Sequence, residues 1–300
     1  MRLTPHLRAV LQALLVAFLW STSWVLIKIG LQREIPPLTF AGLRYTLAFL
    51  CLLPFFLRRS DYRTLLKAQT RRSWMWLLLL GLLFYTATQG AQFVGLALLP
   101  AATVNLLLAC TAVVVALFGI RMLAERPTAL QWGGMGLYLV GVAVYFYPAV
   151  LAGDQIIGIL VVSGGVLANA GSALLGRAIN REGVLPPLII TTVSMGIGAV
   201  VLLAVGIATQ GMPILSITEW LIIAWLALVN TAFAFTLWNH TLRTLTALES
   251  SLINNTMLIQ IPLLAWVFLG EALDIKAILA LVIAGAGILI VQLRRLPFRR

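Results

Sequence analysis

The sequence is short of charge, and of acidic charge above all. Charged residues make up 10% of the 300 residues, with 9 Asp and Glu against 21 Lys and Arg, whereas 61% of the chain is apolar. A water-soluble domain carries about 25% charged residues, because its surface must be solvated. A soluble fold is therefore excluded, and the mean hydropathy of +1.03 indicates a protein embedded in a bilayer.

The residue types that build catalytic and metal sites are also scarce. The chain has only two His and two Cys, and no carboxylate lies deep within an apolar segment. A catalytic constellation, a metal site or a disulfide framework is therefore not expected, nor is a cofactor. No nucleotide-binding sequence of the G-x-x-x-x-G-K-[ST] type occurs, which excludes ATP-driven transport by this chain alone. The basic residues cluster beside apolar runs, which is typical of anchors facing anionic lipid rather than of nucleic-acid binding.

Polar, proline and glycine residues divide the chain into apolar segments long enough to cross a bilayer, which takes about 20 residues per helix. The first is too long for the apolar part of a signal peptide and is predicted to be a retained helix. The sequence therefore predicts an all-α integral membrane protein with ten transmembrane helices. Their approximate limits are 9–30, 38–57, 74–97, 101–122, 129–148, 156–178, 186–208, 219–240, 247–269 and 275–293.

The distribution of Lys and Arg predicts the orientation. With the N-terminus inside, 17 of the 21 basic residues fall in cytoplasmic segments, six of them in the loop after the second span. Only Lys28, Arg33 and Lys276 fall outside, and Arg44 lies within the second span. Because cytoplasmic loops carry the excess of Lys and Arg, both termini are predicted to be cytoplasmic.

An internal duplication is the most informative pattern. A Pro-Pro pair at 36–37 recurs at 186–187, an offset of 150 residues. Glu125 and Glu271, each following an apolar helix, are separated by 146 residues, as are several matching leucines, alanines and glycines. Several pairs in the same order at nearly constant spacing indicate a repeat more than the general likeness of apolar helices.

The duplication predicts two halves, residues 1–150 and 151–300, with five helices each. Because five is odd, the second half must enter the membrane from the opposite side, so the repeats are inverted. Inverted repeats can exchange conformations across a pseudo-two-fold axis and thereby open a central site to either side. This pattern favours a secondary transporter that works by alternating access.

Short motifs in both halves carry a resemblance to a known family. The matching stretches are Leu19-Trp20-Ser21, Pro36-Pro37-Leu38-Thr39-Phe40, Leu43-Arg44-Tyr45, Glu125, Glu271, and Trp238-Asn239 with Leu242. With these motifs the chain resembles the EamA-type, ten-helix branch of the drug/metabolite transporter superfamily, and the resemblance implies a protein of the bacterial inner membrane. Relatives export amino acids, other metabolites or drugs, and the bacterial amino-acid exporters make amino acids the leading class.

Polar and aromatic side chains within the spans are the candidate substrate contacts, since such groups at bilayer depth tend to face a wet cavity or the bundle interior. Three in the third span share one helical face, and their repeat partners Thr231, Phe235 and Trp238 share another. Interhelical hydrogen bonds and core packing remain the alternatives at each position. The predicted substrate-binding residues are Trp20, Tyr85, Gln89, Gln92, Asn105, Trp238 and Asn254.

Four further residues are predicted to act in gating or in structure. Arg44 is the one charge set well inside a span; it could bind a substrate carboxylate, but the family match implies a structural role. Glu125 and Glu271 stand at equivalent loop edges and are interpreted as gate or hairpin braces. Pro262 removes a backbone hydrogen bond and should kink the ninth span.

The leading hypothesis is an exporter of small amphiphilic metabolites, above all amino acids with apolar or aromatic side chains. With no titratable group at the midplane, the substrate gradient is the expected driving force, and a drug or metabolite exporter with proton antiport is the alternative. An integral-membrane lipid enzyme and an assembly subunit are the rival classes. The expected partners are the substrate and the bilayer, with the chain a monomer.

Overall fold

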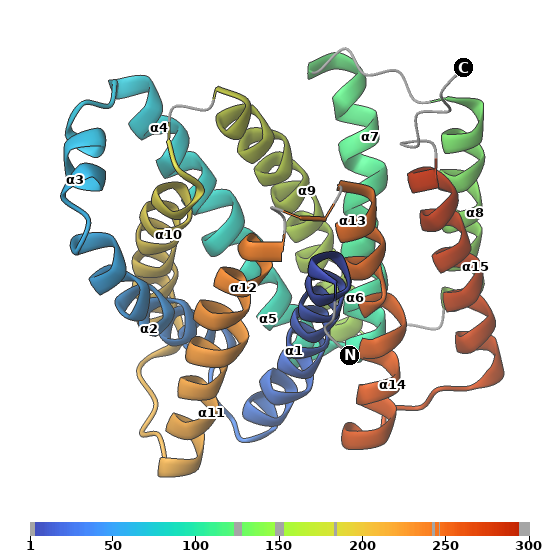
Figure 1. Ribbon diagram of the computed structural model, residues 1–300. Helices are drawn as coiled ribbons and strands as arrows, with labels where there is room; N and C mark the ends of the chain where they lie inside the picture. The colour runs from blue at the N-terminus through green and yellow to red at the C-terminus, as the bar shows by residue number, and fades with distance from the viewer. Residues whose placement is uncertain are drawn as a thin grey trace, which may run out of the picture.

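A computed structural model describes residues 4–122, 128–147, 153–182, 185–241, 244–245 and 247–293. These residues form helices and no strands (Figure 1). Nine helical stretches among them are long and apolar enough to cross a membrane, and Ile275–Val291 is a shorter apolar helix that corresponds to the tenth predicted span. The predicted all-α membrane class is confirmed.

Each predicted span is present, four of them as consecutive helical pieces. The loop after the second span contains the short helix α3, which the sequence analysis did not predict, and two segments, η1 and η2, are π-helical. The helices are α1 Pro5–Gln32, α2 Pro37–Leu57, α3 Ser60–Lys67, α4 Arg71–Leu80, η1 Gly81–Thr88, α5 Gln89–Leu98, α6 Ala101–Ala109, α7 Thr111–Met122, α8 Ala129–Phe146, α9 Gly153–Glu182, α10 Pro187–Gln210, α11 Ile217–Ala227, η2 Leu228–Phe233, α12 Ala234–Thr241, α13 Ala247–Asn255, α14 Met257–Leu269 and α15 Ile275–Leu293.

Helix starts are specified by the same kinds of residue in both halves. Proline occupies the first position of α2 and of α10, where its missing N–H has no helical partner to lose. Thr70 and Ser216, 146 residues apart, accept backbone N–H groups at the starts of α4 and α11. Thr128 and Asp274, again 146 apart, do the same for α8 and α15. Side-chain capping therefore fixes equivalent helix boundaries.

Helix interruptions repeat as well. The break between α6 and α7 falls at Cys110, and the break between α13 and α14 falls at Thr256, 146 residues later. The π-helical segments η1 and η2 also overlap at this offset. The duplication thus extends to local irregularities, and π-helical turns occur frequently at functional sites.

Equivalent helices of the two halves pack against each other in antiparallel pairs. Along α2 and α10, a Cβ added at Gly42 would lie 2.5 Å from the Cα of Leu203, and one at Gly206 would lie 2.5 Å from the backbone N of Thr39. Residue numbers increase along α2 in the direction in which they decrease along α10, so these helices run in opposite directions. The pair α8 and α15 packs antiparallel at the other side of the bundle (Figure 1). The repeats are therefore inverted.

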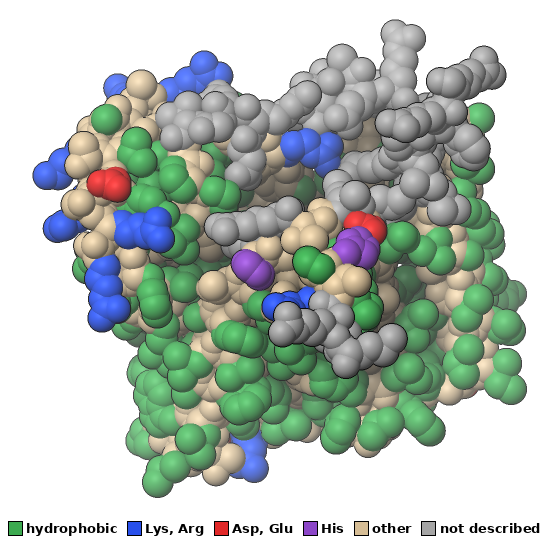
Figure 2. Space-filling model, viewed as in Figure 1, with side chains coloured by type: hydrophobic (Ala, Val, Ile, Leu, Met, Phe, Trp, Pro, Cys, Tyr) green, Lys and Arg blue, Asp and Glu red, His purple; other side chains and the backbone are tan. Residues whose placement is uncertain are grey.

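The surface separates into an apolar body and a basic end. Large exposed side chains such as Leu160, Trp266 and Val282 project from the helices, as expected where lipid covers the protein. Figure 2 shows Lys and Arg gathered over α3, with hydrophobic side chains covering most of the lower part of this face. We call the end of the bundle that carries α3 the basic end.

The basic end gives a topology prediction. Reporter fusions after Arg63 and after Arg300 are expected to report cytoplasm, and a fusion after Asp154 is expected to report the outside, because Lys and Arg are retained on the cytoplasmic side. Paired alkaline phosphatase and green fluorescent protein fusions measure both outcomes. A cytoplasmic signal at Asp154 would contradict the predicted orientation.

Candidate functional site

An aromatic cluster joins α1 to α12. The ring of Trp20 lies 5.3 Å from that of Phe235 and 5.2 Å from that of Trp238, with tilted planes in both pairs. The indole Nε1 of Trp20 is buried and has no hydrogen-bond partner in the described chain. The structure thus brings together two predicted substrate contacts, and it adds Phe235, which the sequence marked only as a repeat partner of Gln89.

A buried asparagine holds the π-helical segment η2 against α1 beside this cluster. Asn230 is fully enclosed, and its Nδ2 donates to the backbone O of Leu19 and, at 3.2 Å, to Oγ1 of Thr22. Its Oδ1 has no partner among the described residues. Sequence reasoning missed Asn230, because a lone amide in an apolar segment does not show which helix it will contact.

A polar cluster joins α2 to the third span. The Tyr45 hydroxyl donates to Oε1 of Gln89 at 2.6 Å, and the rings of Tyr45 and Tyr85 lie 5.6 Å apart. The Nε2 of Gln89 donates to no described residue, and Gln92 makes no hydrogen bond with any of them. Gln89 is 9% exposed and Gln92 is 8% exposed. Among the described residues, the structure therefore shows no interhelical hydrogen bond from Gln92.

Arg44 belongs to α2, and its side chain reaches Phe93 of α5 and Thr231 of η2. The residue is 4% exposed. Its Nε donates to Oγ1 of Thr231 at 3.1 Å, and the Thr231 hydroxyl in turn donates to the backbone O of Leu226 at 2.8 Å. The guanidinium carbon lies 5.1 Å from the ring centroid of Tyr45 and 6.0 Å from that of Phe93. No carboxylate of the described residues forms an ion pair with it.

Asn105 connects the fourth span to the ninth, about one helical turn before Pro262. Its Nδ2 approaches the backbone O of Met257 at 3.4 Å and of Leu258 at 3.5 Å. Leu258 is the residue whose carbonyl loses a helical partner because Pro262 has no N–H. The helix α14 continues through Pro262, so the predicted kink there stays a prediction, and the span is interrupted at Thr256. The interhelical role that the sequence left open for Asn105 is thus present.

The ninth span places its two asparagines differently. Asn254 is exposed and makes no hydrogen bond with the described residues, whereas the Nδ2 of Asn255 is buried without a partner. No hydrogen bond therefore joins Asn254 to the described residues of the aromatic or the polar cluster. Its predicted role as a substrate contact stays a prediction.

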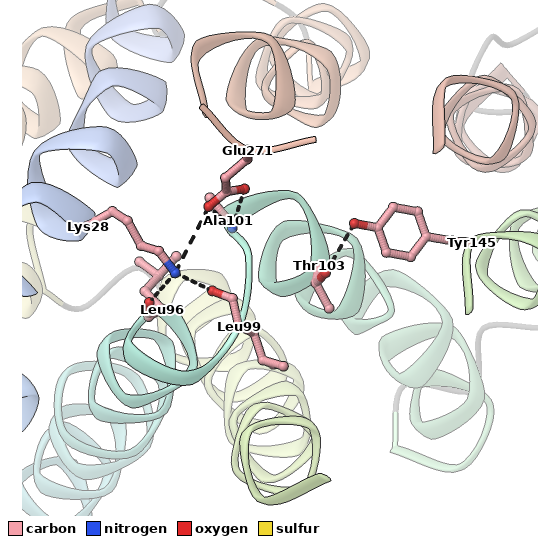
Figure 3. Close-up of polar contacts among 7 residues, drawn as sticks. All are labelled: Lys28, Leu96, Leu99, Ala101, Thr103, Tyr145 and Glu271. Atoms are coloured by element: carbon pink, nitrogen blue, oxygen red, sulfur yellow. Dashed lines mark hydrogen bonds and ion pairs between the residues drawn. The ribbon is translucent and has the colours of Figure 1, made fainter. Parts of the chain in front are cut away.

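At the end of the bundle opposite α3, an ion pair forms between Lys28 of α1 and Glu271, which follows α14, and both residues bind the turn between α5 and α6 (Figure 3). The Lys28 ammonium donates to the backbone O of Leu96 at 2.7 Å and of Leu99 at 2.5 Å, at the end of α5. Both carboxylate oxygens of Glu271 accept the N–H of Ala101 at 2.8 Å, at the start of α6. Lys28 Nζ lies 4.0 Å from Glu271 Oε1.

This cluster, which we call the outer clasp, consists of Lys28, Glu271 and the α5–α6 turn between them. The contacts of Glu271 are compatible with a brace, and that role stays a prediction, whereas the contacts of Lys28 were not predicted. A single sequence signal pointed to it, namely that both residues fall on the outer side in the predicted topology. Glu125, the repeat partner of Glu271, lies outside the described residues.

The described helices hold no group of three or more His, Cys, Asp or Glu side chains that could bind a metal ion. Near the middle of the bundle they place the guanidinium of Arg44, the carboxamides of Gln89 and Gln92, and several aromatic rings. Such groups donate hydrogen bonds and stack, so they suit a small organic ligand.

Comparison with known proteins decides the family. A profile of the EamA-like transporter family matches residues 7–147 and again 156–293. The chain belongs to this family. Its members are transporters and not enzymes, so the protein is a multi-pass membrane transporter.

Among its relatives, the uncharacterized transporter YvbV of Bacillus subtilis is 27% identical over 211 residues, which cover 70% of this chain and 66% of YvbV, just under two thirds of it. The uncharacterized inner membrane transporter YedA of Escherichia coli K12 is 27% identical over 234 residues, covering 75% of this chain and 71% of YedA. A crystal structure with 20% sequence identity superposes with a TM-score of 0.69, over 96% of this chain and 98% of the other. This likeness shows that the two chains share a fold, and no more.

Proposed function

We propose that this transporter exports small amphiphilic metabolites, with amino acids that carry apolar or aromatic side chains as the leading class. The observation that supports this most is the contact of Trp20 with Phe235 and Trp238. The three aromatic rings come from two helices, and the indole N–H of Trp20 has no partner among the described residues. Together the rings offer a surface on which an apolar or aromatic group can stack.

The polar part of the substrate would meet the carboxamides of the third span. An amide enclosed in an apolar bundle without a partner is costly, because it loses hydrogen bonds to water. Gln92 and the Nε2 of Gln89 have no hydrogen-bond partner among the described residues, and both residues stay slightly exposed, which favours contact with water or substrate. A site with rings on one helix and amides on another suits a molecule with both kinds of group.

Alternating access follows from the inverted repeats, since rocking of one half against the other opens a central site to either side. Within the described helices, the acidic residues stand at or near helix ends and His240 is exposed near the end of α12. The substrate's own gradient is therefore the proposed driving force for export. Proton antiport by an exporter of drugs or other metabolites remains the second candidate.

Replacing Gln92 by alanine is expected to lower the initial rate of L-phenylalanine counterflow about tenfold, because hydrogen bonds worth about 1.5 kcal/mol would be lost. The rate is measured with radiolabelled L-phenylalanine in vesicles that contain purified protein. The folded yield should change less than about twofold, since no group of the described part of the chain is hydrogen-bonded to this amide.

The matched control is Leu78→Ala on the same span, whose side chain is 43% exposed and faces outward. Its counterflow should equal that of the unmodified protein. An equal loss in both variants would assign the effect to packing, and absence of L-phenylalanine counterflow in the unmodified protein would contradict the amino-acid class. Counterflow of a drug such as ethidium in its place would support the second candidate.

A further inference from the structure

Arg44 is a buried charge without a countercharge. It is 4% exposed, begins about 10 Å from the start of α2 at 1.5 Å per residue, and has no carboxylate partner among the described residues. A charged side chain inside a membrane bundle normally has an opposite charge or backbone carbonyls to bind, or it faces a polar pathway. Among the described residues, neither an opposite charge nor a backbone carbonyl binds the guanidinium of Arg44.

One edge of the guanidinium is held by the protein and the other is unused. Nε donates to Thr231, while Nη1 and Nη2 donate to no described residue. The residue as a whole keeps 4% of its surface exposed. The pair of parallel N–H groups on this edge matches the two oxygens of a carboxylate.

The orientation of this edge is fixed before any ligand arrives. The Thr231 hydroxyl is itself committed to Leu226, and the rings of Tyr45 and Phe93 flank the guanidinium. A side chain held in this way loses little rotamer entropy when it binds a ligand. A merely structural arginine would be expected to use its terminal nitrogens on neighbouring carbonyls, and Arg44 does not.

Neighbouring groups add donors and no negative charge. The Oε1 of Gln89 already accepts from Tyr45, so its Nε2 is the group left for a ligand. Thr231, which holds Arg44, and Phe235, which contacts Trp20, are four residues apart, about 6 Å of helix rise. One molecule with a carboxylate and an aromatic ring could therefore contact both sites.

We propose that Nη1 and Nη2 of Arg44 bind the carboxylate group of the transported substrate. The inference rests on the proposed export of amphiphilic metabolites, and it adds the group by which they are recognised. It also accounts for the buried charge, because a bound carboxylate supplies the missing countercharge. The protein should then distinguish acids from uncharged molecules of the same shape.

The test compares 3-phenylpropionate with 3-phenylpropionamide, which differ in charge and little in size. Each is titrated against the thermal unfolding midpoint of the purified, detergent-solubilised protein. The acid is expected to bind at least about tenfold more tightly than the amide, because hydrogen bonds to charged groups are the stronger ones. In Arg44→Gln the two affinities should agree within about twofold.

Arg33→Gln is the matched control, because Arg33 is exposed at the end of α1 and its loss should leave the preference for the acid intact. The unmodified protein tests the proposal even if Arg44→Gln fails to fold. Equal binding of acid and amide, no binding of the acid, a preference that survives in Arg44→Gln, or equal stabilisation by sodium chloride would each overturn it. Failure of L-phenylalanine counterflow with the acid preference intact would instead refute the amino-acid class alone.

Discussion

Replacing Gly141 by leucine is expected to abolish the accumulation of folded protein. A Cβ at this position would lie 2.6 Å from the backbone N of Ala284 and 2.7 Å from the backbone O of Ala280, both on α15. These atoms belong to the helix backbone, so they cannot move aside as a flexible side chain would. Close approach through small residues supplies much of the attraction between membrane helices, and a larger side chain would separate α8 from α15.

The loss is expected to exceed the roughly 1–3 kcal/mol of ordinary overpacking, since the whole helix pair must shift. Folded yield is measured by fluorescence-detected size-exclusion chromatography of the solubilised protein. Gly133 and Gly136, on the same helix, have no neighbouring atom within 4 Å of an added Cβ. Leucine at either should leave the yield close to normal, and a normal yield of Gly141→Leu would show that α8 and α15 do not pack as described.

Exchanging the charges of the outer clasp, with Lys28→Glu and Glu271→Lys combined, is expected to lower transport at least about tenfold and not to restore it. An ion pair alone would survive the exchange. Here the ammonium binds carbonyl oxygens at the end of α5 and the carboxylate binds the first N–H of α6. The exchanged groups would face the wrong ends of these helices, where a misplaced charge is unfavourable. Initial rates of counterflow in vesicles measure the effect.

The single variants set the scale for the double variant. Lys28→Met removes the two carbonyl contacts, and Glu271→Gln keeps one acceptor for Ala101 while it removes the charge. Each should transport more slowly than the unmodified protein and faster than the exchange. The charge exchange of Arg33 and Glu34, both exposed beyond α1, is the control and should have little effect. Recovery of transport in the double variant of the clasp would mean that only the ion pair matters.

The sequence was sufficient for the membrane class, the spans and the repeat. Hydropathy reports where a segment crosses the bilayer, because the hydrocarbon layer requires a continuous apolar stretch. The capping residues and the Pro-Pro pairs act locally, so equivalent helices begin at the positions where the repeat predicts them. The α3 helix was missed because it is short and amphipathic within a basic loop.

The candidate site was predicted only in part. The contact between Trp20 and Trp238 brings two predicted residues together, and Gln89 and Gln92 lie in the bundle interior. For Arg44 the sequence left open a structural role and contact with a substrate carboxylate, and the proposed binding role starts from its bond to Thr231 and from terminal nitrogens that bind no described residue. Lys28 was predicted only to lie on the outer side, and the structure shows that it binds the end of α5.

What the sequence by itself determined is therefore depth and order along the chain: which residues lie in the membrane, and which positions of the two halves correspond. Only the tertiary structure decided which faces of the helices meet. In a soluble protein the alternation of polar and apolar residues would show the buried face of a helix, but lipid and the bundle interior are both apolar, so the pattern loses that information. Contacts between residues as distant in sequence as Arg44 and Thr231 depend on the rotation of each helix against its neighbours.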